Sequence, residues 1–165
     1  MTWSKIVAVS TAVLFVFGIA MIGSAVAGEK IKWQGTSVVT ETKQMEVGDV
    51  EGHVLLILKQ KQMYMLPNGE KRAGDAVTSM ELNPKMNQFS LKGVGWVVDK
   101  DGDKIMREHE GKPAGKDHWK GTYTYTGGTG KFEGIKGGGT WDSISMGQGQ
   151  PSFLEVVGEQ EIPKQ

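Results

Sequence analysis

The sequence of 165 residues contains no cysteine and only 5 prolines. Without cysteine, the protein has no disulfide, no thiolate metal ligand, no cysteine nucleophile and no lipid-modified N-terminal cysteine. Its fold must therefore be stabilised by the burial of side chains. Glycine, with 24 residues, is by contrast abundant, yet no tract is repetitive enough to indicate a collagen-like or disordered chain.

An excess of charge of one sign is also missing. The 19 lysine and arginine residues balance the 19 aspartate and glutamate residues, and the two signs are interspersed. Proteins that bind nucleic acid or an anionic membrane surface through charge usually carry a basic stripe. The sequence shows no such stripe, so we expect no nucleic-acid partner.

The first 27 residues have the pattern of an export signal. Residues 1–5 supply a short positive start, residues 6–22 form an uncharged and mostly apolar run, and Ala25-Val26-Ala27 is the small-x-small pattern that a signal peptidase cuts after. We predict a signal peptide over 1–27 and one exported domain over 28–165, periplasmic or secreted, without a membrane span. The alternative is that the apolar run stays as an uncleaved anchor.

The rest of the chain is dominated by apolar residues that recur with period two, and helical periodicity is scarce. This alternation indicates strands with one buried face, and short turn-forming connections favour antiparallel neighbours. Eight or nine such strands imply a barrel or a sandwich. We predict an all-β, closed, antiparallel eight-stranded barrel, because closure removes the edge strands. The predicted strands are 31–36, 38–46, 53–65, 75–82, 88–98, 104–110, 118–126, 139–146 and 153–161.

A membrane barrel is a poorer fit to the same pattern. Its strands need an unbroken apolar face toward lipid. Residues 59–62, Lys-Gln-Lys-Gln, and residues 107–110, Arg-Glu-His-Glu, instead place polar groups on both faces of their strands. We therefore expect a soluble, exported barrel and not a membrane barrel.

Seven glycines lie within residues 126–141, TGGTGKFEGIKGGGTW. The spacing does not match a Walker A loop, because Phe132 stands where that motif needs serine or threonine, and the third glycine of a dinucleotide fingerprint is replaced by glutamate. We predict instead two tight reversals around an apolar plug. Thr129 is predicted to cap one helical turn over 130–134, so that Phe132 and Ile135 close one end of the barrel.

The same stretch resembles a motif of two barrel families. It is similar to the TGGxGxFEGxxG stretch of allene oxide cyclases, and its GGTGKF resembles that of plant dirigent proteins. The resemblance implies an eight-stranded antiparallel barrel that encloses a small hydrophobic molecule and, in some members, guides its cyclisation or coupling. The early-strand motifs that supply the working groups of the cyclases are not found. The matching residues are structural ones: Gly127, Gly128, Gly130, Phe132, Gly134 and Gly137.

Three patterns raise the question of a metal site, and each has a simpler interpretation. Four acids match positions 1, 3, 5 and 12 of a calcium loop, but Lys104 occupies the position that needs glycine, and Asp101-Gly102 is typical of a hairpin turn. Met63-Tyr64-Met65 has soft ligands for Cu(I), although methionine is more often core. The histidines are widely spaced. We predict no metal and no cofactor. The four acids are Asp99, Asp101, Asp103 and Glu110, and the histidines are His53, His109 and His118.

Aromatic residues on several predicted strands are candidates for the wall of a ligand cavity, because pockets are mainly apolar with few polar anchors. The same side chains would also fill a small barrel completely, so a hollow and a filled interior are both open. The predicted wall residues are Trp96, Trp119, Tyr123 and Trp141, and the predicted polar anchors at the mouth are Glu108, His109 and Asp142.

The sequence is compatible with three functions. The first is an exported barrel that binds a small hydrophobic molecule in its interior. The second is an allene oxide cyclase-like or dirigent-like isomerase or cyclase, which needs an ionisable group with a shifted pKa inside an apolar pocket. The third is a structural or assembly protein of the cell envelope with a filled barrel and an exposed aromatic patch. The resemblance also implies association into a homo-oligomer.

Overall fold

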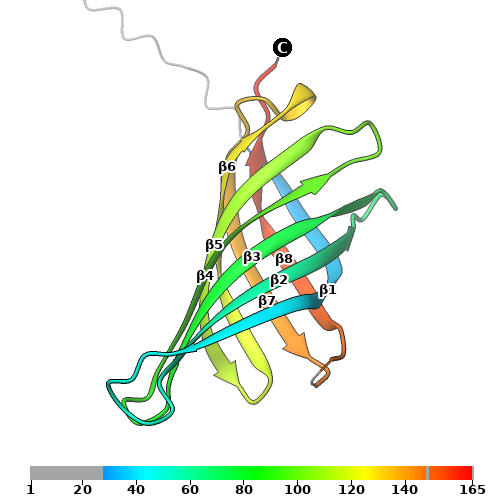
Figure 1. The fold of residues 1–165 in the computed structure, drawn as a ribbon. Coiled ribbons are helices and arrows are strands. Elements are labelled where there is room, and N and C mark those ends of the chain that lie inside the picture. Colours follow the sequence, from blue (N-terminus) through cyan, green and yellow to red (C-terminus); the bar gives the residue numbers. More distant parts are fainter. Residues whose placement is uncertain (1–27, 148, 165) are drawn as a thin grey trace, which may run out of the picture.

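The protein is a closed barrel of eight antiparallel strands, in which each strand pairs with the next and the last pairs with the first (Figure 1). The computed structural model describes residues 28–147 and 149–164, so the predicted signal peptide lies outside the described residues. The predicted fold class is confirmed. The strands are β1 (Glu29–Glu46), β2 (Val54–Met65), β3 (Lys71–Asn83), β4 (Gln88–Val98), β5 (Lys104–Gly115), β6 (His118–Gly128), β7 (Lys136–Ser145) and β8 (Ser152–Glu161).

The first two predicted strands are one long strand in the structure. β1 pairs with β8 over its first half and with β2 over its second half, and its register shifts between Val39 and Glu41. Such a bulge adds one residue and reverses which side chains point inward. The alternation of apolar residues is therefore interrupted near Val38 and Val39, although the strand continues.

The half of the barrel at the start of β1 has a solid core. Trp33 and Tyr64 are almost completely buried, and their ring centroids lie 5.9 Å apart. The guanidinium of Arg72 lies 4.9 Å from the ring centroids of both Trp33 and Phe132, and it donates a hydrogen bond to Glu70 at 3.0 Å. Aromatic rings and a paired cation therefore fill this end. The core also contains Ile31, Val97, Ile105, Tyr123, Tyr125, Ile135 and Val156.

The connection between β6 and β7 closes this end as a plug. A short 3₁₀ helix, η1 (Gly130–Phe132), buries Phe132, and Ile135 is buried just after it, with 2% and 4% of their surfaces exposed. Gly130 and Gly134 have φ angles of 54° and 74°, which favour glycine. Within 28–147 and 149–164, no helix is long and apolar enough to cross a membrane.

Thr129 is the N-cap residue of η1, as predicted, but the expected cap by its side chain is wrong. Its side chain makes no cap hydrogen bond to η1, and its hydroxyl accepts instead from the backbone N–H of Lys104 at 2.8 Å. Lys131 then binds the carboxylates of Asp99 and Asp101 in the β4–β5 turn, with 2.6 Å to Asp101. Burial raises the pKa of Asp99, but hydrogen bonds from Lys131 and from the turn outweigh it and lower that pKa. The plug is thus fastened to the neighbouring hairpin.

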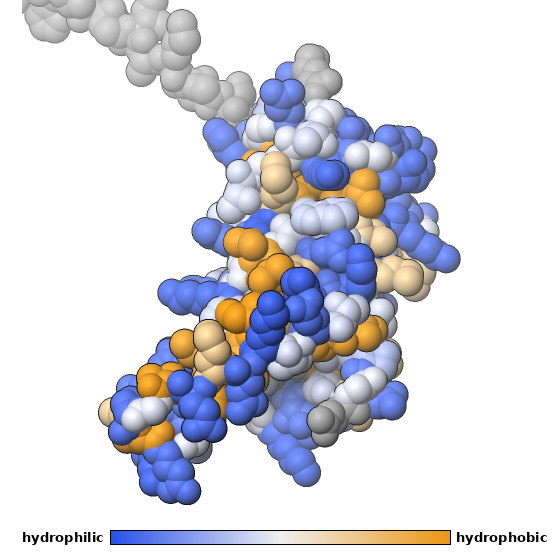
Figure 2. Space-filling model, viewed as in Figure 1, coloured by the Kyte–Doolittle hydropathy of each residue, from blue (hydrophilic) through white to orange (hydrophobic). Residues whose placement is uncertain are grey.

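The barrel wall is taller on one side at the opposite, open end. There the β1–β2 and β3–β4 hairpins extend beyond the other strands (Figure 1), and this projecting part shows hydrophobic surface among hydrophilic side chains (Figure 2). Met45 and Met86 have 54% and 57% of their surfaces exposed. His53 ties the two hairpins together, because its ring nitrogens lie 2.7 Å from Asp49 and 3.2 Å from Glu81.

Candidate functional site

A cavity of about 240 Å³ occupies the open half of the barrel, beyond the solid core. Inward-pointing side chains of alternate residues on β1 to β8 form its wall, as strand geometry requires. The interior is therefore filled at the plug end and hollow at the other end. The lining residues are Ser37, Val39, Leu58, Gln60, Gln62, Tyr64, Thr78, Met80, Leu91, Arg107, His109, Trp119, Tyr123, Trp141, Ser143, Ser145, Ser152, Leu154 and Val156.

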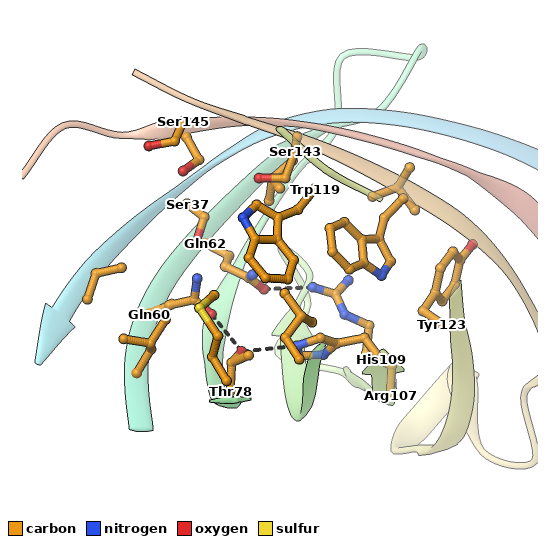
Figure 3. Close-up of a pocket in the computed structure, with 18 of the residues that line it drawn as sticks. Ser37, Gln60, Gln62, Thr78, Arg107, His109, Trp119, Tyr123, Ser143 and Ser145 are labelled. Carbon is orange, nitrogen blue, oxygen red and sulfur yellow. Dashed lines mark hydrogen bonds between the residues drawn. The ribbon is translucent and has the colours of Figure 1, made fainter. Parts of the chain in front are cut away.

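Aromatic rings from β6 and β7 form one side of the cavity. Trp119 and Tyr123 of β6 point into it (Figure 3), and Trp141 of β7 joins them. The indole of Trp141 lies over Gly111 and Gly121, where any added Cβ atom would collide with the ring. Its Nε1 donates to the carbonyl oxygen of Thr122 at 3.1 Å. Glycines on β5 and β6 therefore make room for a fixed aromatic wall.

Arg107 of β5 places a buried positive charge against the cavity. Only 7% of its surface is exposed. One terminal guanidinium nitrogen donates to Gln62 Oε1 and to the hydroxyl of Tyr64, each at 2.6 Å, and the guanidinium carbon lies 5.0 Å from the Tyr64 ring centroid. All these partners are neutral. The guanidinium is thus held in one orientation without being neutralised.

His109 lies two residues further along β5, on the same inward face. Its Nε2 lies 3.0 Å from Thr78 Oγ1, which in turn donates to Gln60 Oε1 at 2.8 Å (Figure 3). Because the Thr78 hydroxyl has one proton and gives it to Gln60, His109 must donate from Nε2. Burial, and secondly the charge of Arg107, lowers the pKa of His109 to about 4. The imidazole is therefore neutral at physiological pH, with its Nδ1 atom unprotonated.

One further polar group of the wall lacks a protein partner. The hydroxyl of Ser37 is buried without a hydrogen bond to the described residues, whereas the hydroxyl of Tyr123 lies against that of Tyr125. Burial also raises the pKa of Tyr123, so its phenol is neutral at physiological pH. The cavity wall therefore combines apolar surface with neutral polar groups and one cation, Arg107.

Three of the predicted site residues lie on the outer face of the barrel. Trp96 points outward beside Asp75 and under the ammonium group of Lys104, which is 5.2 Å from its ring centroid. Glu108 is exposed on the outer face of β5, between the inward residues Arg107 and His109.

Asp142 is the third outward residue, on β7. Its carboxylate binds His118 at 2.6 Å and Lys120 at 3.0 Å on the outer face of β6. Burial raises the pKa of Asp142, but its hydrogen bonds to Lys120 and His118 outweigh it and lower that pKa. All three residues are direct neighbours in sequence of inward-pointing residues, so their own side chains point outward. The candidate site therefore does not include Trp96, Glu108 or Asp142. The predicted residues that the structure brings together at the cavity are His109, Trp119, Tyr123 and Trp141.

The main polar residues of the wall were not predicted as site residues. Arg107, Gln60 and Gln62 belong to the two polar runs that argue against a membrane barrel. Strand alternation contains the missing signal, because Arg107 shares the face of His109, and Gln60 and Gln62 share the face of Tyr64. Thr78 has no distinctive sequence signal, since it lies in a run of small and apolar residues on β3.

Comparisons with known proteins identify the fold. No protein-family model matches the chain, and no curated protein sequence matches it. Among solved structures, it is similar to the pterocarpan synthase dirigent protein PsPTS1, with a TM-score of 0.52 and 13% identity over 83% of this chain and 96% of that chain. The pterocarpan synthase dirigent protein GePTS1 matches with a TM-score of 0.52 and 14% identity over 82% of this chain and 90% of that chain. The chain therefore has a dirigent-like barrel fold.

Proposed function

We propose that this barrel binds a small, largely apolar molecule in its cavity and holds it in one orientation, as a dirigent-like protein. The observation that carries the proposal is the hollow half of the barrel, where Trp119, Trp141 and Tyr123 face polar groups of β2, β3 and β5. Apolar walls with a few fixed polar anchors are typical of ligand sites. A dry protein cavity of about 150 Å³ holds benzene, so about 240 Å³ has room for a ring with a short substituent.

The filled-barrel alternative is less well supported. A structural barrel needs no internal space, whereas this one keeps a cavity lined by Arg107 and His109. Burying such groups is costly unless they are hydrogen-bonded or paired with an opposite charge. The polar wall therefore favours a ligand over a purely structural role.

Tryptophan fluorescence tests the binding proposal with a panel of phenolic and lipid compounds. We expect at least one compound to change the emission, and Trp141→Ala to weaken its binding by roughly tenfold to a hundredfold, because aromatic anchors dominate binding energy. Trp96→Ala is the matched control, since Trp96 lies on the outer face, and it should leave the affinity within about twofold. The absence of any spectral change with every compound would count against the proposal.

A second candidate function is catalysis by the same cavity, an isomerase or cyclase activity. The two solved structures described above are of proteins named pterocarpan synthases. The observation that favours catalysis is His109, whose neutral imidazole lies in a partly apolar pocket beside the cation of Arg107. The unprotonated Nδ1 atom of a neutral imidazole can accept a proton during a reaction, and the fixed charge of Arg107 can stabilise a developing oxyanion.

Chromatography of each bound compound before and after incubation separates the two functions. If the protein is an enzyme, the wild type converts a bound compound, and His109→Gln slows the conversion by roughly a hundredfold or more while binding persists. If a compound binds tightly and is recovered unchanged, with the same stereochemistry as before incubation, the protein is a binding protein instead.

We also propose that the protein is exported, to the periplasm or beyond the cell, and that it associates with copies of itself. Support for export comes from the signal pattern over 1–27, which lies outside the described residues. Fractionation of cells followed by mass spectrometry of the N-terminus tests export and cleavage after Ala27. Light scattering of the purified barrel measures its association state.

A further inference from the structure

Among the described residues that line the cavity, Arg107 is the only charged one at physiological pH, because the imidazole of His109 is neutral. It forms no ion pair with any residue in 28–147 and 149–164. The second deeply buried arginine, Arg72, provides an internal comparison, because it has Glu70 at 3.0 Å. The two arginines are equally buried, with 7% and 5% exposed, but only the one at the cavity lacks a carboxylate. The missing counter-ion is thus a feature of the cavity.

The surroundings of Arg107 orient its charge toward the cavity. Gln62 and Tyr64 both bind the same terminal nitrogen, and the remaining N–H groups of the guanidinium donate to no described residue. These donors adjoin the space between β5 and the aromatic wall (Figure 3). A guanidinium presents paired parallel donors that match the two oxygens of a carboxylate. Burial of the guanidinium without a counter-ion is costly. An anion that pairs with it therefore gains binding free energy.

We propose that the ligand is a small aromatic or short-chain carboxylic acid, whose carboxylate pairs with Arg107 while its apolar part lies against Trp119 and Trp141. The inference rests on the proposed binding function and names the chemical class of the ligand. The single cation favours a monoanion over a phosphate dianion, because His109 adds no charge and no lysine is among the described residues that line the cavity. Because benzene occupies a cavity of about 150 Å³, a cavity of about 240 Å³ is too small to bury a long acyl chain completely.

Titration calorimetry at pH 7 with matched acids and esters tests this inference. The probes are phenylacetate and octanoate, each compared with its methyl ester, so that the apolar part is kept and the charge is removed. On the wild type, we expect at least one acid to bind about tenfold to a hundredfold more tightly than its ester. Arg107→Met is expected to abolish this preference while the ester still binds, because the apolar wall is intact.

Two further variants keep the result interpretable. Lys120→Met removes a cation from the outer face of β6 and is expected to leave the acid preference unchanged. Arg107→Lys keeps a charge without the paired donors and should retain part of the preference. Should Arg107→Met fail to fold, as judged by circular dichroism, the comparison of Arg107→Lys with the wild type replaces it.

The outcomes separate the inference from the proposed function. Equal binding of acids and esters to the wild type overturns the inference and leaves the binding function standing. An acid preference that survives in Arg107→Met also overturns it, because another group must then hold the carboxylate. If neither acids nor esters nor any compound of the fluorescence panel binds, the proposed function fails and the inference fails with it.

Discussion

Replacing Phe132 with alanine is expected to lower the free energy of unfolding by about 3–5 kcal/mol, the usual cost of truncating a buried phenylalanine. The ring is 98% buried at the plug, since 2% of its surface is exposed, and it packs in the core that fills this end of the barrel. It also lies 4.9 Å from the guanidinium carbon of Arg72. Truncation therefore opens a cavity and removes the face on which a buried cation rests.

Phe153→Ala is the matched control for this prediction. Phe153 belongs to β8 but points outward, with 56% of its surface exposed, so its truncation is expected to cost less than about 1 kcal/mol. Urea unfolding followed by circular dichroism measures both variants, and thermal melts should show a decrease of roughly 10 °C for Phe132→Ala alone. Similar losses for the two variants would show that Phe132 does not hold the plug in place.

The plug and the strand pattern were the parts of the fold that the sequence predicted best. Closely spaced glycines around Phe132 and Ile135 require sharp reversals, and the two apolar residues need a place to be buried. The cap at Thr129 was mispredicted because a threonine hydroxyl bonds equally well to a neighbouring strand, here to the backbone of Lys104. Local propensity does not reveal that competing partner.

The candidate site was less predictable from the sequence. Alternation divides the residues of a strand between two faces, but it does not show which face points into the barrel. On β4 the inward residues include Gly93 and Gly95, so the large side chain of Trp96 looked like the lining residue although it points outward. A hollow half also depends on how much of the interior the plug fills, which is a property of all eight strands together. The polar wall of Arg107, Gln62 and Thr78 comes from three different strands. No single segment of the sequence contains these residues together, so no local motif predicts the wall.

Acidification from pH 6.5 to pH 4 is expected to destabilise the wild-type protein by up to about 3 kcal/mol through His109. Burial lowers the pKa of His109 to about 4, from 6.5 in the unfolded chain, so the unfolded state takes up the proton first. The stabilisation is therefore complete above pH 6.5 and is lost as the pH falls toward 4. Protonation would also place a second positive charge beside Arg107.

Other groups with shifted pKa values affect the unfolding free energy at different pH values. The contribution of His109 can therefore be measured separately. The pKa of His53 is raised, chiefly by its hydrogen bond to Asp49, so its contribution is complete below pH 6.5 and is lost as the pH rises through that higher pKa. The lowered pKa of Asp99 has the opposite consequence, because its stabilisation is complete above pH 3.8 and is lost in stronger acid. Between about pH 4 and pH 6.5, the change of unfolding free energy with pH therefore comes mainly from His109.

The variant His109→Gln tests the assignment, because an amide can still donate to Thr78 but does not titrate. Urea unfolding at half-unit steps between pH 4 and pH 7 should give a flatter dependence of unfolding free energy on pH than in the wild type. His53→Gln serves as the control, since the contribution of His53 is already complete below pH 6.5, and this variant should retain the wild-type slope between pH 4 and pH 6.5. If His109→Gln loses stability with acid as steeply as the wild type does, His109 is not the group that titrates, and the neutral imidazole in the cavity wall must be reconsidered.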